Sequence, residues 1–212
     1  MGREHLASTV LLGALAVAGC GSLTTYRTAA PLPAGRWHAD VAVDVGTFRD
    51  REQDTRTPAA HVEVAVRRGL GADTDATVKL TVPGLEVGVL HRLATGRWQW
   101  AVAAAVGGER TRVGPGQTDA VFGHLRLTGL ATRATRARWA FTVGPVVTGG
   151  VFVPAGGGWS HGVLVGGFAN AAWRFAGAWV AVPELSLHAS ASGDVPVRGA
   201  VAQVGVAVGR GF

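Results

Sequence analysis

Residues 37–46 read WHADVAVDVG, and apolar and polar side chains alternate along this stretch. Trp37, Val41 and Val45 fall on one face, whereas His38 and Asp44 fall on the other. Alternation with a period of two residues is typical of a β-strand that has one face in apolar surroundings. The stretch therefore predicts a strand with one apolar and one polar face.

The same alternation recurs along the chain to its last residue. It is clear in HVEVAVRR at 61–68, ATVKLTV at 76–82, LEVGVLHRL at 85–93 and VRGAVAQVGVAVGRGF at 197–212. About ten such segments occur, most of them near the roughly 9–11 residues with which a tilted strand crosses a bilayer. The sequence thus predicts an all-β chain, an antiparallel up-and-down transmembrane β-barrel of about ten strands, with eight as the lower count.

A soluble β-sandwich or lipocalin-like barrel would give the same alternation with the apolar face turned inward. Composition favours the membrane barrel, because only 16% of residues are charged and the mean hydropathy is +0.25. The spacing of the segments favours it too, since longer connections such as GERTRVGPGQTD alternate with shorter ones such as TRATRA. Long outer loops and short periplasmic turns are typical of outer-membrane barrels.

Tryptophans gather at the segment ends that this topology places on the periplasmic side. Tryptophan prefers the membrane interface, where its ring meets headgroups and its N–H finds a polar partner. An interface aromatic girdle is predicted from Trp37, Trp98, Trp139, Trp173 and Trp179. Most arginines fall near the same edge, where they would meet anionic headgroups.

The first 20 residues have the order of a secretory leader, with Arg3, the apolar run VLLGALAVA and the small residues Ala18-Gly19 before Cys20. This ending resembles the lipobox of bacterial lipoproteins. The resemblance implies cleavage before Cys20, acylation of the Cys20 thiol, and an outer-membrane destination because Gly21 follows. The predicted organisation is a signal peptide over 1–19, a lipidated N-terminus and flexible tether over 20–35, and a β-barrel domain over 36–212.

The predicted inner face carries charges, and buried charges need partners. We expect a network inside the barrel formed by Asp40, Glu63, Lys79, Arg126 and Glu184. The residue types of a hydrolase triad occur in ELSLH at 184–188, but steps of two residues place Glu184, Ser186 and His188 about 6–7 Å apart, beyond hydrogen-bond reach. No catalytic residue, metal site or cofactor is predicted.

The expected function is that of a non-enzymatic outer-membrane lipoprotein barrel, acting as a structural or surface-interaction protein or a narrow pore. The ending VAQVGVAVGRGF resembles the C-terminal strand signature of outer-membrane barrels, which implies the barrel-assembly machinery as a partner. The expected partners also include membrane lipids and the lipoprotein-sorting machinery, and nucleic acid is not expected. A lipid-anchored periplasmic domain that binds a small apolar ligand is the main alternative, and a lipid-modifying hydrolase is a distant third.

Overall fold

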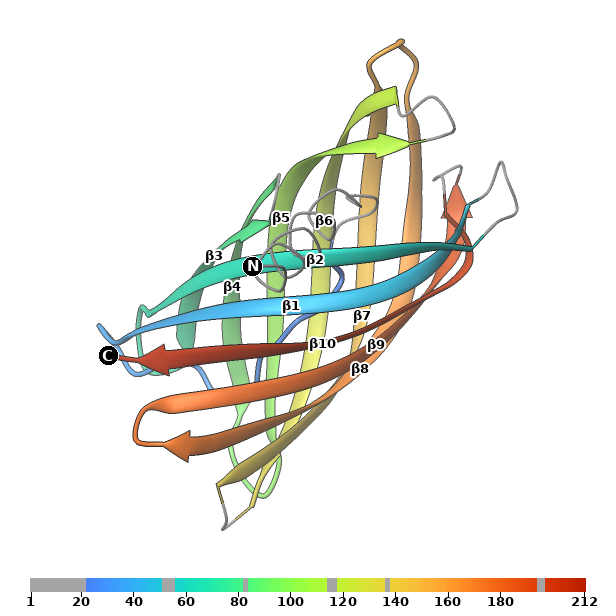
Figure 1. The fold of residues 1–212 in the computed structure, drawn as a ribbon. Coiled ribbons are helices and arrows are strands. Elements are labelled where there is room, and N and C mark those ends of the chain that lie inside the picture. The colour runs from blue at the N-terminus through green and yellow to red at the C-terminus, as the bar shows by residue number, and fades with distance from the viewer. Residues whose placement is uncertain (1–21, 51–55, 82–83, 114–117, 136–137, 194–196) are drawn as a thin grey trace, which may run out of the picture.

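The computed structural model describes residues 22–50, 56–81, 84–113, 118–135, 138–193 and 197–212. These residues form ten antiparallel strands and no helix: β1 (Trp37–Asp50), β2 (Arg56–Gly69), β3 (Thr74–Thr81), β4 (Gly84–Ala94), β5 (Gln99–Val113), β6 (Thr118–Ala134), β7 (Trp139–Pro154), β8 (Ser160–Ala176), β9 (Trp179–Gly193) and β10 (Val197–Gly211). Each strand pairs with the next in sequence, and β10 pairs with β1 to close the barrel (Figure 1). The prediction of a ten-stranded up-and-down barrel is confirmed.

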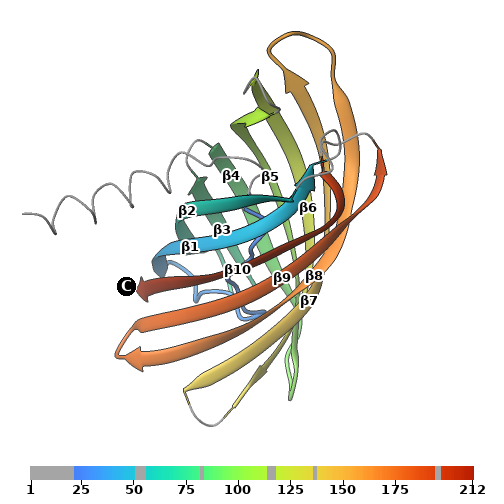
Figure 2. The same cartoon turned by 45° about the vertical axis from the view of Figure 1, so that its right-hand side comes forward.

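Several strands are longer than expected, reaching 17 residues in β6 and β8. Parts of the stretches expected as outer connections are strand, because β5 runs to Val113, β6 starts at Thr118 and β7 runs to Pro154. The β5–β6 and β7–β8 hairpins therefore project beyond the rest of the barrel (Figures 1 and 2). Continued pairing satisfies backbone donors and acceptors that a loop would leave to solvent.

The two faces of the sheet divide as the alternation predicts, with the apolar face outward. In β1, Val41 and Val43 are 53% and 50% exposed, whereas Ala42 and Asp44 are 1% and 2% exposed. The soluble β-sandwich or lipocalin-like alternative is wrong, because it requires the apolar face to point inward. An exposed apolar surface on this scale marks contact with another apolar phase.

The outward apolar run of β1 covers most of the height of an outer-membrane barrel's apolar band. In β1 the outward apolar residues run from Trp37 to Val45. A rise of about 3.3 Å per residue and a tilt of about 40° convert this run to about 20 Å along the barrel axis. Outer-membrane barrels carry an apolar band of about 25 Å.

The two chain ends of the barrel meet at one rim, where β1 begins and β10 ends, and which we term the terminal rim. Trp37 N–H donates to Phe212 O, and Phe212 N–H donates to Trp37 O, each at 2.9 Å. These bonds continue the β1–β10 ladder to the last residue. Phe212 itself is exposed on the outside of the barrel.

Candidate functional site

The barrel interior is occupied by residues 22–35, which we term the N-terminal segment. Ser22, Leu23, Thr24, Tyr26 and Ala29 are all buried. The segment has no regular secondary structure and runs behind β1 and β10 (Figures 1 and 2). The stretch expected as a tether over 20–35 thus has residues 22–29 inside the barrel. Their small and hydroxylated side chains fit between the walls, and their backbone groups find partners there.

The carboxylate of Glu184 in β9 holds the centre of the segment. Glu184 accepts hydrogen bonds from the backbone N–H groups of Thr25, at 2.5 Å, and Tyr26, at 2.6 Å. It also accepts one from Asn170 Nδ2 at 3.0 Å, and Nδ2 is 3.0 Å from the carbonyl of Arg27 as well. A buried carboxylate is stabilised by accepting several N–H bonds. One side chain thus satisfies two backbone donors of an otherwise irregular segment.

Other strands of the wall bind the segment's carbonyl and hydroxyl groups. Arg126 in β6 donates from Nη2 to Ser22 O at 2.6 Å and from Nη1 to Thr24 O at 3.2 Å. The hydroxyl of Thr24 donates to Glu63 Oε1 in β2 at 3.1 Å. Glu184 therefore binds N–H groups of the segment, and Arg126, from another strand, binds its C=O groups.

Nearer the terminal rim, the segment pairs Arg27 with Asp75. The Arg27 guanidinium donates to Asp75 Oδ1, and Leu32 N–H donates to Asp75 Oδ2 at 3.2 Å. Asp75 in β3 is fully buried. The Arg27 guanidinium is charged, as arginine is in proteins at neutral pH.

Asp75 was not among the residues predicted for the inner network. The alternating segment ATVKLTV at 76–82 begins one residue after Asp75. The alternation that puts Thr77 and Lys79 inward extends back two more residues to Asp75 in β3. Following the period of two beyond the start of that segment would have found it.

The five residues predicted for the inner network all lie on the inner face, although they do not form one cluster. Lys79 Nζ lies 3.5 Å from Glu63 Oε2 and 3.5 Å from Glu86 Oε1, and Arg126 Nη2 lies 3.3 Å from Glu86 Oε2. Glu86, which the prediction left out of the network, is its centre. The remaining two lie apart from it: Asp40 Oδ2 is 3.9 Å from Arg67 Nε, and Glu184 binds the N-terminal segment.

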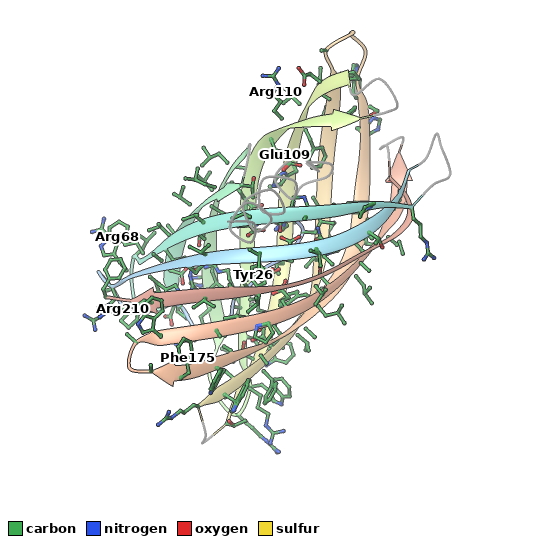
Figure 3. All side chains as sticks on the ribbon, viewed as in Figure 1. Tyr26, Arg68, Glu109, Arg110, Phe175 and Arg210 are labelled. Carbon is green, nitrogen blue, oxygen red and sulfur yellow. The ribbon has the colours of Figure 1, made fainter. Side chains whose placement is uncertain are left out.

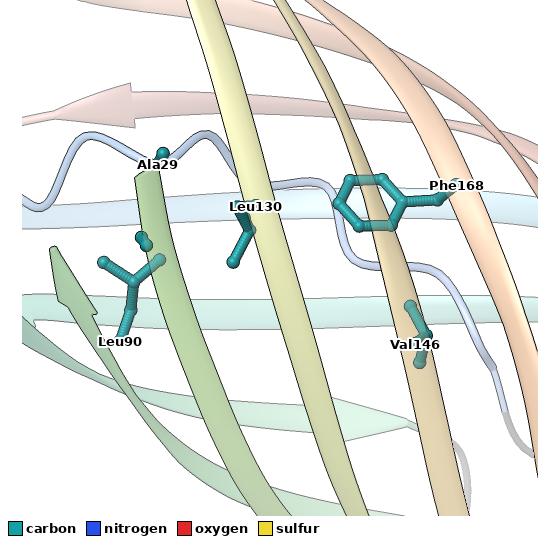
Figure 4. Packing of buried hydrophobic residues seen from close by; sticks show 6 residues of the cluster. Ala29, Leu90, Leu130, Val146 and Phe168 are labelled. Atoms are coloured by element: carbon teal, nitrogen blue, oxygen red, sulfur yellow. The ribbon is translucent and has the colours of Figure 1, made fainter. Parts of the chain in front are cut away.

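Apolar contacts fill the space between these polar groups. Tyr26 packs with small wall residues that include Ala42 and Ala207. Ala29 packs against Leu90, Leu130 and other residues of a second cluster, Val146 and Phe168 among them (Figure 4).

Two glycines of the wall make room for the segment. A Cβ on Gly205 would collide with the Tyr26 hydroxyl, and a Cβ on Gly69 would collide with the carbonyl oxygen of Pro33. The wall is therefore shaped to the segment at both positions.

Between the segment and the β1–β6 wall lies a cavity of about 50 Å³. Its charged lining residues are Arg27, Asp40, Glu63, Arg67, Lys79, Glu86 and Arg126. Elsewhere in the described interior, Ser186 Oγ, Thr148 Oγ1 and both ring nitrogens of His188 are buried without a hydrogen-bond partner in the protein. Buried polar atoms of this kind bind water, and the cavity holds room for a few molecules.

The five tryptophans predicted as a girdle are exposed on the outside, close to the terminal rim. Three begin β1, β7 and β9, Trp98 directly precedes β5, and Trp173 lies near the end of β8. The Trp139 and Trp173 rings stack with centroids 5.6 Å apart. Trp100 is exposed near the same rim and was missed.

Arginines accompany these rings on adjacent strands. The Arg68 guanidinium lies 5.1 Å from the Trp37 ring centroid, and that of Arg210 lies 5.9 Å from the Trp179 centroid. Figure 3 shows Arg68, Arg210 and Phe175 at this end of the barrel and Arg110 towards the other. Cation–π pairs at a polar–apolar boundary suit both partners.

Glu184, Ser186 and His188 do not form a hydrogen-bonded triad in the structure. Glu184 is committed to the N-terminal segment, and Ser186 and His188 make no hydrogen bond with each other. No group of three or more His, Cys, Asp or Glu side chains is placed to hold a metal in the described ranges. Those ranges also hold no helix long and apolar enough to cross a membrane. Cys20 lies outside the described residues.

Comparison with solved structures finds the same fold in outer-membrane proteins. An outer-membrane channel from Pseudomonas putida F1 matches with a TM-score of 0.56 and 11% identity, over 87% of this chain and 98% of that one. Neisserial surface protein A matches with a TM-score of 0.47 and 9% identity, over 84% and 99%. The NalP translocator domain of Neisseria meningitidis matches with a TM-score of 0.43 and 11% identity, over 98% and 95%. The chain has the outer-membrane β-barrel fold.

No protein-family model matches the chain, and no curated protein matches it.

Proposed function

We propose that this chain is an outer-membrane protein whose barrel is a narrow pore closed by its own N-terminal segment, and that it acts without catalysis. The observation that carries the proposal is the way the segment is held. Backbone and side-chain groups of the segment bind polar groups of the wall. The same wall carries ion pairs and lines a cavity with room for a few water molecules. A wall designed only as a packed core would not need ion pairs and buried carboxylates, which are costly to bury.

The size of the barrel supports this reading. Eight strands enclose an interior that side chains alone can fill, whereas barrels of 16–18 strands leave an aqueous channel. A barrel of ten strands lies between these cases, and here the N-terminal segment occupies the space that the wall side chains leave. Removal of the segment would leave a water-filled passage lined by polar groups. The fold is shared with a protein described as an outer-membrane channel.

The test is ionic current through the full chain in planar lipid bilayers. The chain without acylation on Cys20 should be closed most of the time. Tyr26→Ala combined with Arg27→Ala removes the buried ring and the ion pair with Asp75, so the segment should leave and current should appear. Arg110→Ala is the matched control, since this exposed arginine pairs with Asp119 far from the interior. A double variant that stays closed, although hydrogen exchange shows the segment released, would refute the pore.

We also propose a lipid anchor on Cys20, supported by the lipobox resemblance. The test is Cys20→Ala behind a cleavable non-lipoprotein leader, followed by urea and carbonate washes of the membranes. The barrel should remain in the outer membrane, because its apolar band is outside. Release of the variant into the soluble fraction would mean that acyl chains were the sole anchor.

The anchor and the seated segment place opposing demands on the chain. Leu23 packs against Ala59, Leu164 and Val201, which lie near the ends of β2, β8 and β10 opposite to the terminal rim. Gly35 N–H bonds Gly69 O at the terminal rim itself. The seated segment thus begins, at Ser22 and Leu23, near the rim opposite to the terminal rim. An anchor in the leaflet at the terminal rim would draw the segment out and open the pore.

That coupling has its own readout. Hydrogen exchange of residues 22–35 should be faster in the lipidated chain than in the Cys20→Ala variant, both in bilayers. Equal exchange in the two proteins would show that the anchor does not draw the segment out of the barrel.

A further inference from the structure

We infer that the barrel interior selects cations, and that Arg27 is a tethered cation held at one of its sites, the buried carboxylate of Asp75. The selectivity rests on the proposed pore, whereas the cation site at Asp75 stands without it. The ligand class is a small monovalent cation, and the chemistry at Asp75 fits a guanidinium group best.

The charge of the inner wall is the first observation. Between the rims, seven carboxylates face inward in the described residues: Asp40, Asp44, Glu63, Asp75, Glu86, Glu109 and Glu184. Three arginine or lysine side chains face them from the wall: Arg67, Lys79 and Arg126. Histidines 38, 61, 124 and 188 also face inward. Among the aspartate, glutamate, arginine and lysine side chains, the wall therefore carries an excess of negative charge.

The excess is not spread evenly. Lys79 and Arg126 lie against Glu63 and Glu86, so that cluster is balanced. Asp44 and Glu184 lie on either side of Gly205 as its register partners in β1 and β9. Neither has an arginine or lysine within ion-pair distance in the part of the chain that the structure describes. Asp44 instead meets His61 Nδ1 at 2.9 Å.

The second observation is what the N-terminal segment offers to these carboxylates. It brings the Arg27 guanidinium to Asp75, two backbone N–H groups to Glu184 and the Thr24 hydroxyl to Glu63. The segment carries no carboxylate of its own. Towards these carboxylates the segment acts as a donor with one positive charge, as a cationic ligand would.

When the segment leaves, these carboxylates face water. Rings of aspartate and glutamate side chains make pores selective for cations, because a low-dielectric wall concentrates their field in the passage. Departure of the segment frees both oxygens of Asp75, which bind Arg27 and Leu32 N–H in the closed state, and a planar guanidinium can bind both oxygens of a carboxylate together. The open lumen should therefore pass K⁺ in preference to Cl⁻ and bind guanidinium more tightly than Na⁺.

The first test measures the reversal potential of the opened full chain, Tyr26→Ala with Arg27→Ala, in a KCl gradient. We expect K⁺ to be favoured over Cl⁻ by about fivefold or more, as carboxylate-lined pores favour cations. Adding Asp44→Asn and Glu184→Gln should bring the ratio close to one. Asp119→Asn removes a carboxylate outside the lumen and should leave the ratio unchanged. The inference would be overturned by a preference for Cl⁻, or by a K⁺/Cl⁻ ratio that stays the same when Asp44→Asn and Glu184→Gln are added.

The second test needs no current. In Arg27→Ala, millimolar guanidinium chloride should restore slow hydrogen exchange to residues 22–35, and NaCl at equal ionic strength should not. Arg27→Lys keeps the charge and should need no guanidinium, which checks that the variant barrels fold. If neither guanidinium nor sodium slows hydrogen exchange of residues 22–35 in Arg27→Ala, the cation site at Asp75 is refuted. Rescue without current in the opened chain would refute the pore and retain the cation site.

Discussion

Glu184→Gln tests the hydrogen bonds that hold the N-terminal segment, because it removes the charge of Glu184 with almost no change in side-chain volume. Glu184 accepts from Thr25 N–H and Tyr26 N–H through different oxygens. In glutamine one of those oxygens becomes an NH₂ group, so at least one segment amide loses its acceptor. A hydrogen bond to a charged group contributes about 1.5–3 kcal/mol.

Taking about 2–3 kcal/mol for the loss, the segment should detach about 30- to 150-fold more often. The measurement is hydrogen exchange of peptides covering residues 22–35, read by mass spectrometry in bilayers. The Thr25 and Tyr26 amides report directly, because they are the donors. The strands of the barrel should exchange as before.

Glu109→Gln is the matched control. Glu109 lies on the inner face of β5, and its Oε1 is buried without a hydrogen-bond partner in the protein. It should leave exchange of the segment unchanged. Equal exchange in Glu184→Gln and the unaltered chain would refute the view that this carboxylate holds the segment. Faster exchange of the whole barrel in Glu184→Gln would show a role in the wall instead.

Three further changes probe the wall and the rim. Gly205→Ala should push Tyr26 from its seat and lower the free energy of unfolding by about 1–3 kcal/mol in a denaturant titration, as overpacking does, whereas Gly149→Ala, with open space around its Cβ position, should not. Lys79→Gln leaves two inner carboxylates without their shared cation and should lower the free energy of unfolding by about 3–5 kcal/mol; a loss under about 1 kcal/mol would mean that water already screens the pair. Trp139→Leu should lower the unfolding midpoint in bilayers but not in detergent if its ring, stacked on a neighbouring tryptophan, anchors the barrel at the interface.

Much of the fold could be read from the period of two. The alternation in WHADVAVDVG and its repeats predicts strands, their number and the division of residues between two faces. Local pattern is enough for this because successive side chains of a strand point to opposite sides whatever the strand packs against. The same pattern placed Asp40, Glu63, Lys79, Arg126 and Glu184 on one face before any contact was known.

Which face is inside could not be read from the period, because a soluble barrel and a membrane barrel share it. The closed barrel decides the matter, since Val41, Val43 and Val45 are exposed on its outside. The ends of the strands were also misjudged. Residues such as Arg110 and Thr111 look like loop residues, but pairing with β6 keeps them in strand.

The N-terminal segment shows what only the tertiary structure decides. GSLTTYRTAAPLPAG has two prolines and small polar residues, and on its own such a stretch is extended and flexible. Its order comes from Glu63, Asp75, Arg126 and Glu184, which lie 39 to 159 residues away in sequence. No local pattern encodes a partner at that distance. The sequence by itself determined the strands and their two faces, because those follow from neighbouring residues; the filled interior was decided by barrel closure, which brings charged groups of distant strands around one short segment.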